Sequence, residues 1–319
     1  MKTFTIFSFI AALALLSSSC KNDHNEYGQM KGINFYSRND AITFEQISFD
    51  NATGIANDTL KRKGLLNIGA NTFTNADGSA FTGKVVVSVR ENYVRGFMAL
   101  NSVPTTSSDS KPMSAEGAVY ISAVDLQGHE LKIASGKNID YKMPGGAIPN
   151  QCKLYYANDD VKDPSPANTA LFNWNESSTD SVEYYFDTNA GKYYYSLKPT
   201  QLGWISCAKI ISNANPVGIK VRVIGVSAIS STNTAVYVVP VNGKSAYRLW
   251  NYDKASNLFS LDQPCLNNGS NVYVIAIASS RHFKIFYAKE LVAVGVDTQI
   301  NTHAIEVNLA AISANLYIL

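Results

Sequence analysis

Cys20 is the side chain with the clearest chemical role in the sequence, because it ends a short apolar run near the first residue. Lys2 gives the run a positive start, an apolar stretch covers residues 6–16, and the three serines 17–19 precede the thiol. This order is typical of an exported bacterial protein whose signal peptide is removed and whose new N-terminal cysteine carries lipid. The run is also shorter than the roughly 20 residues that a permanent membrane-spanning helix needs. We therefore predict a signal peptide over residues 1–19 and lipid on Cys20.

Residues 20–30 are expected to form a tether between the lipid and the first folded domain. The six residues that follow Cys20 carry no apolar side chain that could pack against a core. They resemble the acidic export signal of surface lipoproteins in Bacteroidetes, and an ordinary linker on the periplasmic side is the alternative. The sequence thus predicts a lipid-anchored protein of the outer membrane, facing either the surface or the periplasm.

The rest of the sequence carries none of the common catalytic motifs. It has no G-x-S-x-G, H-E-x-x-H, G-x-x-x-x-G-K-S/T or G-x-G-x-x-G. The carboxylate cluster at 158–163 lacks the alternate oxygen ligands and the glycine of a calcium loop, and the segment 187–191 stops after two ligands. We expect no cofactor and no metal, and a non-enzymatic protein is favoured, although distant residues can converge in any fold.

Three cysteines, Cys152, Cys207 and Cys265, remain once Cys20 carries lipid. They allow one disulfide and one free thiol, or three buried thiols that act as small apolar side chains. No C-x-x-C pair indicates a zinc or redox site.

Composition favours strands, since the chain has 18 Tyr and 14 Phe and only 16% charged residues, against a typical value of about 25%. The net charge is +2, and the only basic block is Lys61, Arg62 and Lys63, which is expected to be a solvated turn before a strand. Nothing in this pattern calls for a nucleic-acid partner.

Strand-like segments fill residues 31–146. The strand-like segment 65–83 contains an Asp77-Gly78 turn signal and is followed by a second strand-like segment at 84–90. A second hairpin joins 117–125 to 130–134. A proline and two glycines at 144–146 end the next strand and mark the first predicted domain boundary.

The order of these motifs resembles ZU5-like β-sandwich domains of uncharacterised Bacteroidetes lipoproteins. The matching segments are 66–73, 75–78 and 82–87, and the block at 202–207 is similar to another block of such lipoproteins. The resemblance implies a β-sandwich without an assigned activity. Some ZU5 domains cleave themselves at a His-Phe-Ser step, but here Lys284 follows the His-Phe pair, so this activity is not implied. Phe73 and Trp204 are expected in cores.

The middle region, 147–212, contains a predicted hairpin of 182–186 and 192–197. If Phe186 lies opposite Lys192, side-chain alternation places three tyrosines around a carboxylate on one face. Such a face could stack on sugar rings or fill a partner's groove, and the alternative is that a neighbouring domain covers it. The candidate binding face consists of Glu183, Tyr185, Tyr193 and Tyr195.

Residues 213–319 show seven short strand candidates with turn signals between them, as an immunoglobulin-like or transthyretin-like sandwich requires. A last segment at 310–319 is either a strand or a docking helix. The candidates are 219–226, 234–239, 246–252, 258–261, 271–278, 282–288 and 304–309.

The sequence therefore predicts an all-β protein with two sandwich domains joined by a hairpin-containing middle region. The favoured function is a non-enzymatic, lipid-anchored envelope protein that binds glycan or protein partners or acts in assembly. A hydrolase of extracellular glycan is the alternative, and it needs two carboxylates about 5 to 10 Å apart. A fimbrial subunit, which would donate or accept an edge strand, is a third function.

Overall fold

The computed structural model describes residues 44–319 except 101–102, 147–150, 158–172 and 281–283. The predicted signal peptide, Cys20, the tether and the carboxylate cluster at 158–163 lie outside these residues. Strands dominate the described chain, which has two short helices, α2 (Arg95–Leu100) and α3 (Leu309–Tyr317). The predicted all-β class is confirmed. No helix in this part of the chain is long and apolar enough to cross a membrane.

Two antiparallel sheets form the N-terminal sandwich. One sheet has six strands, in the order β1 (Glu45–Asp50), β5 (Lys84–Asn92), β6 (Met113–Asp125), β13 (Gly203–Ile210), β9 (Lys153–Ala157) and β10 (Trp174–Glu176). The other has five, in the order β11 (Val182–Asp187), β12 (Lys192–Leu197), β8 (Ile139–Gly145), β3 (Leu65–Ile68) and β2 (Ile55–Thr59). A separate two-stranded ribbon pairs β4 (Phe73–Asn75) with β7 (Leu131–Ile133).

Alternation along the strands builds the core between these two sheets. On β5 the side chains of Val85, Val87 and Val89 are buried in one cluster, because every second residue of a strand points to the same face. Phe73 belongs to the same cluster, as predicted.

The region predicted as a separate middle part, 147–212, supplies strands to both sheets of this sandwich. β12 pairs with β8, and β13 pairs with β6. The strands before and after the boundary predicted near residue 146 therefore belong to the same two sheets. A Pro-Gly-Gly sequence ends β8 locally, whereas the partners of β6 and β8 are set by pairing over long sequence distances.

A second pair of sheets forms the C-terminal sandwich. Its smaller sheet has the order β18 (Asn251–Asp253), β19 (Leu258–Ser260), β15 (Ile219–Ile224) and β23 (Thr298–His303). Its larger sheet has the order β17 (Tyr247–Arg248), β16 (Thr234–Pro240), β21 (Asn271–Ser279), β22 (Ile285–Ala293) and β24 (Ile305–Val307). A short ribbon pairs β14 (Pro216–Val217) with β20 (Leu266–Asn267).

Most predicted strands of this sandwich are present. The candidates at 219–226, 234–239, 258–261 and 271–278 correspond to β15, β16, β19 and β21, while the candidate at 246–252 divides into β17 and β18. β23 was not predicted, because its sequence is polar and it joins the sheet by parallel pairing with β15. Of the two alternatives for the last segment, the structure has the helix, α3.

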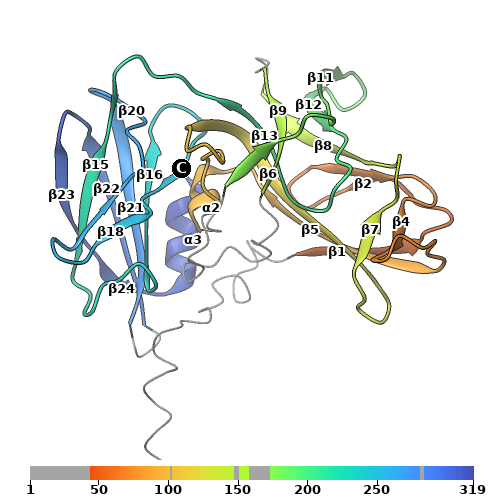
Figure 1. The fold of residues 1–319 in the computed structure, drawn as a ribbon, viewed down its shortest axis with the longest axis horizontal. Coiled ribbons are helices and arrows are strands. Elements are labelled where there is room, and N and C mark those ends of the chain that lie inside the picture. The colour runs from red at the N-terminus through yellow and green to blue at the C-terminus, as the bar shows by residue number, and fades with distance from the viewer. Residues whose placement is uncertain (1–43, 101–102, 147–150, 158–172, 281–283) are drawn as a thin grey trace, which may run out of the picture.

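The two sandwiches share a third apolar core, here called the seam core, with α2 and α3 between the two lobes (Figure 1). On β16, Ala235, Tyr237 and Val239 face the seam core, whereas Val236 and Val238 face the inside of the C-terminal sandwich. From the N-terminal side, the outer face of the six-stranded sheet contributes aromatic rings, including Trp204, which is buried as predicted. Several strands of the larger sheets are thus covered on both faces.

Helices α2 and α3 meet at a backbone contact that leaves no room for a side chain. A Cβ atom at Gly96 would lie 2.1 Å from the carbonyl oxygen of Leu316. Beside it, Arg95 donates from Nε to the Leu319 carbonyl (2.8 Å) and from a terminal nitrogen to the Val241 carbonyl (3.0 Å). This contact holds α3 in the seam core.

We predict that Gly96→Ala lowers the free energy of unfolding by about 1 to 3 kcal/mol, because the added methyl group must push two backbones apart. Gly218→Ala is the matched control, since nothing lies within 4 Å of a Cβ at that position. Its expected change is below about 0.5 kcal/mol. Denaturant unfolding of both variants measures this, and equal stability of Gly96→Ala and the parent would show that the helices can separate at no cost.

Candidate functional site

The hairpin predicted to carry a binding face has a register that differs by one residue from the prediction. Asp187 pairs with Lys192 and Phe186 with Tyr193, so the predicted pairing of Phe186 with Lys192 is wrong. The reason lies in the turn, where the Asp187 carboxylate accepts hydrogen bonds from the backbone N–H groups of Asn189 and Ala190. Asp187 thereby becomes the last strand residue.

This shift divides the four predicted residues between two faces. Glu183 and Tyr185 lie on one face, and Tyr193 and Tyr195 lie on the other, because direct cross-strand partners share a face. Tyr195 is fully buried in the N-terminal core. The Tyr193 ring instead stacks on Tyr184, with 5.5 Å between ring centroids. These residues therefore do not form the single platform that the sequence predicted.

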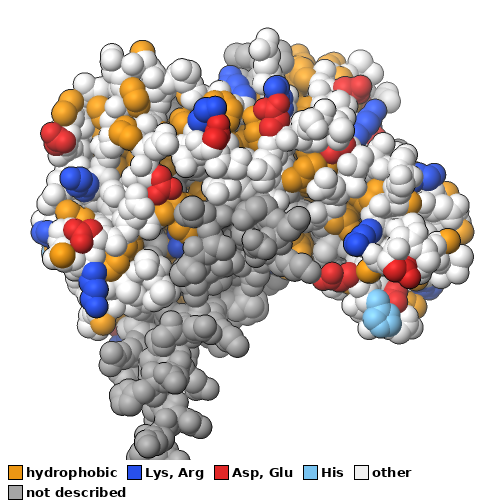
Figure 2. Space-filling model, viewed as in Figure 1, with side chains coloured by type: hydrophobic (Ala, Val, Ile, Leu, Met, Phe, Trp, Pro, Cys, Tyr) orange, Lys and Arg blue, Asp and Glu red, His pale blue; other side chains and the backbone are white. Residues whose placement is uncertain are grey.

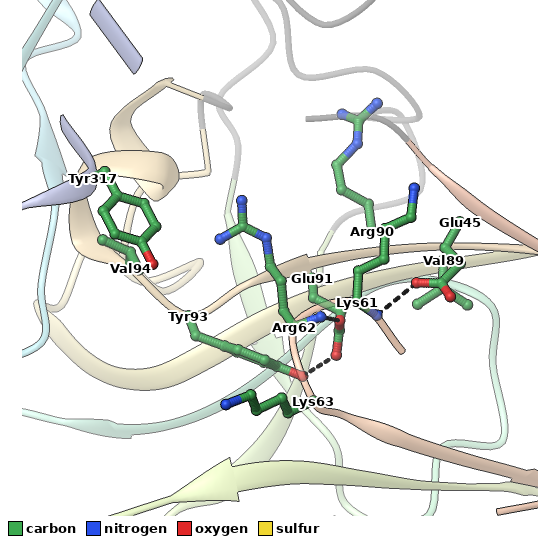
Figure 3. Close-up of a pocket in the computed structure, with 10 residues that line it drawn as sticks. All are labelled: Glu45, Lys61, Arg62, Lys63, Val89, Arg90, Glu91, Tyr93, Val94 and Tyr317. Atoms are coloured by element: carbon green, nitrogen blue, oxygen red, sulfur yellow. Dashed lines mark hydrogen bonds between the residues drawn. The ribbon is translucent and has the colours of Figure 1, made fainter. Parts of the chain in front are cut away.

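A better candidate is a pocket of about 440 Å³ beside the seam core, here called the seam pocket. Its walls come from β1, the turn between β2 and β3, the end of β5 and helix α3. Figure 3 shows Tyr317 and Val94 on one side, Glu45 and Val89 on the other, and Arg62 between them. The volume lies within the range of about 300 to 1,000 Å³ typical of ligand pockets. The lining residues are Glu45, Lys61, Arg62, Lys63, Val89, Arg90, Glu91, Tyr93, Val94 and Tyr317.

Glu91, near the end of β5, organises one wall of the seam pocket. Its Oε2 atom accepts a hydrogen bond from the backbone N–H of Arg62 (2.9 Å), and its Oε1 atom accepts one from that of Gly64 (3.0 Å). The Tyr141 hydroxyl donates to Oε1 at 2.7 Å, and the Tyr93 hydroxyl also contacts this oxygen. The buried carboxylate is thus held by four donors, which offset the cost of removing its charge from water.

The two tyrosines keep their protons at neutral pH. Burial, and then the charge of Glu91, raises the pKa of the Tyr93 hydroxyl well above its usual value. Burial also raises the pKa of Tyr141, with further contributions from Tyr93 and Glu91. Both hydroxyls therefore remain hydrogen-bond donors to the carboxylate rather than acids that titrate near pH 7.

The turn held by Glu91 carries the basic block that was expected before a strand. The Leu60 N–H donates to the Gly64 carbonyl (2.9 Å), which closes the turn around Lys61, Arg62 and Lys63. Lys63 has a φ of 72°, a conformation that costs a non-glycine residue roughly 1 to 2 kcal/mol. At Gly64 a Cβ atom would lie 2.1 Å from Glu91 Oε1, so only glycine allows the carboxylate to approach the turn this closely.

Basic side chains exceed carboxylates in the lining of the seam pocket. Lys61 and Lys63 are exposed, whereas the Arg62 guanidinium lies 4.4 Å from the centre of the Phe97 ring on α2. Arg90 is buried, with its guanidinium 4.0 Å from the Phe44 ring centre. On the molecular face in Figure 2, by contrast, Lys and Arg are scattered among Asp and Glu over both sandwiches. The pocket is therefore a local concentration of positive charge.

Both pocket carboxylates already accept structural hydrogen bonds. Glu45 accepts from the Lys61 backbone N–H at 2.8 Å, and Glu91 is held as described above. Exposed ammonium groups beside them can bind a carboxylate, sulfate or phosphate by charge-assisted hydrogen bonds. Among the described residues, no group of three His, Cys, Asp or Glu side chains is placed to hold a metal.

Sequence reasoning identified the basic block but missed Glu91 and Arg90. The available signal was a pair of adjacent charged residues after an alternating apolar segment. Such a pair usually marks the solvent-exposed end of a strand. Glu91 is held by Tyr141, which lies on the opposite sheet and 50 residues further along the chain, whereas the Arg90 guanidinium packs on the Phe44 ring.

Comparison with known proteins adds no relative from which a role could be transferred. No protein-family model, curated protein or solved structure matches the chain significantly. The ZU5-like and immunoglobulin-like or transthyretin-like resemblances remain predictions.

We expect Glu91→Gln to lower the free energy of unfolding by about 1 to 3 kcal/mol. The carboxylate accepts hydrogen bonds on both oxygens, whereas the –NH₂ group of glutamine would face N–H or O–H donors and could accept none from them. Glu290→Gln changes an exposed carboxylate on β22 and serves as the control. Thermal or denaturant unfolding of the two variants distinguishes them. Equal stability of both would mean that the turn does not depend on the charge of Glu91.

Proposed function

We propose that this protein is a non-enzymatic, lipid-anchored protein of the outer membrane that binds a partner or takes part in assembly. The signal-like start, the acceptor Cys20 and the polar tether support the anchor. Two β-sandwiches that share an apolar core provide a framework on which a binding site can be held.

The observation that carries the binding role is the charge arrangement in the seam pocket. Its exposed basic groups, Lys61 and Lys63, stand on a turn that Glu91 fixes from beneath. We infer that the ligand presents an anionic group, such as a uronate or sulfate of a glycan or a carboxylate of a protein partner. The turn is fixed before the ligand arrives, which lowers the entropy lost on binding.

A glycan hydrolase is less well supported at this pocket. Hydrolysis of a glycosidic bond uses one carboxyl group as an acid and another as a base or nucleophile. Here Glu45 and Glu91 are engaged by backbone N–H groups, and Glu91 also by two tyrosine hydroxyls.

The anchor is tested by Cys20→Ser in the parent organism. We expect the variant to lose the lipid-modified N-terminus at residue 20 and, because serine carries no lipid, to lose the outer-membrane attachment of the parent. Cell fractionation and N-terminal mass spectrometry measure both effects. A variant that stays in membranes with an unchanged N-terminus would disprove lipidation at this residue.

The ligand is tested by the double variant Lys61→Gln/Lys63→Gln, with Lys220→Gln/Lys254→Gln on exposed positions of the C-terminal sandwich as control. Probes are an array of uronate-containing, sulfated and neutral glycans and acidic peptides. Each exposed ion pair is worth about 0.2 to 1 kcal/mol, so we expect affinity for the anionic probes to fall about 2- to 30-fold.

The control should bind like the parent, and binding by the parent should weaken as salt rises. Two results would each overturn the proposal: parent protein that binds none of the anionic probes, or a pocket variant that binds them as tightly as the control.

A further inference from the structure

Two thiols lie side by side in the N-terminal sandwich. Cys207 of β13 is directly opposite Leu154 of β9, and Cys152 precedes Leu154 by two residues. Residues two apart on a strand point to the same face, so Cys152 is the diagonal neighbour of Cys207. Both side chains contact the same apolar cluster, Cys207 as a buried member and Cys152 at its half-buried edge.

The Cys152 thiol is also close enough to affect the ionisation of the Cys207 thiol. Burial raises the pKa of Cys207 well above its usual value, and a hydrogen bond with Cys152 raises it further. The structure holds both as reduced cysteines. Cys152 is the more exposed of the two, so an oxidant reaches its sulfur first.

A bond between the two sulfur atoms requires a small movement of the backbone. Diagonal neighbours have Cα atoms about 7 to 8 Å apart, and a disulfide needs about 6.8 Å or less. Cys152 lies just before β9, whose pairing with β13 ends at Lys153 and Ala208. Its backbone can therefore approach Cys207 without breaking a pair of the ladder.

We propose that Cys152 and Cys207 form a disulfide that links β9 to β13 when the protein meets a disulfide oxidant. The Cys152 sulfur attacks a sulfur of the oxidant's disulfide and forms a mixed disulfide. That attack breaks the oxidant's disulfide and leaves its other sulfur as a thiol. The Cys207 sulfur then attacks the Cys152 sulfur and displaces the oxidant's remaining sulfur as a second thiol. The protein loses two protons and two electrons, and the oxidant's disulfide gains them.

The crosslink joins the two ends of a segment that contains β10, β11 and β12. Closing this segment restricts the unfolded chain and stabilises the sandwich. The inference is independent of the ligand of the seam pocket. It uses export only as the natural source of the oxidant, because disulfides persist in oxidising compartments.

Cys265 provides an internal control. It is buried in the core of the C-terminal sandwich, where burial raises its pKa to about 12. It lies in a different core from Cys152 and Cys207, so we expect it to remain a thiol.

The test uses the full chain carrying Cys20→Ser, treated with oxidised glutathione or with reductant, then denatured, alkylated and mapped by non-reducing mass spectrometry. The expected result is one alkylated thiol, Cys265, and one crosslinked peptide containing Cys152 and Cys207. The melting temperature should rise by several degrees on oxidation and return on reduction. Cys152→Ser and Cys207→Ala should each abolish crosslink and shift, whereas Cys265→Ala should keep both.

Mapping of the peptides reports the bond even if Cys207→Ala is less stable than the parent. The proposal is overturned if all three thiols of the parent remain alkylatable after oxidation. It is also overturned if the oxidised protein carries only mixed disulfides with glutathione, or if the bond joins Cys265.

Discussion

Burial of the seam core is the constraint on which the rest of the structure depends. Strands β16 and β21 carry apolar side chains on both faces, and only one face can point into the C-terminal sandwich. The other face must be covered, because large apolar surfaces are costly in water. The outer face of the six-stranded sheet and the helices α2 and α3 provide that cover. This burial determines where the seam pocket lies, how α2 contacts α3 and how the two sandwiches are oriented.

Glu91 connects this architecture to the chemistry of the surface. A carboxylate at a buried strand end would destabilise the fold unless donors satisfied it. The donors come from the basic turn and from Tyr141 on the facing sheet, so the requirement for satisfaction also fixes where Lys61 and Lys63 stand. The same group therefore stabilises the sandwich and positions positive charge, while Arg62 reaches across to Phe97 of α2.

Much of the fold was predictable from local pattern, and the candidate site was not. Alternating and apolar segments identified most strands, and small or apolar neighbours placed Phe73 and Trp204 in cores. Pairing over long distances was not readable, so the strands β9 to β13 were assigned to a region of their own. The hairpin register failed because the capping role of Asp187 shortened the turn by one residue. The role of Glu91 depends on partners from three separate segments, which no local pattern reveals.

The pairing of β6 with β13 sets the order in which the chain can fold as it emerges from the N-terminus onward. β6 ends at Asp125, yet β13, which pairs with its other edge, begins only at Gly203. Until about two-thirds of the 319 residues have emerged, the hairpin of β5 and β6 has one edge unpaired and an apolar face uncovered. Such an intermediate is prone to aggregate. The emerging chain therefore needs either fast arrival of the next 80 or so residues or a chaperone that shields this edge in the meantime.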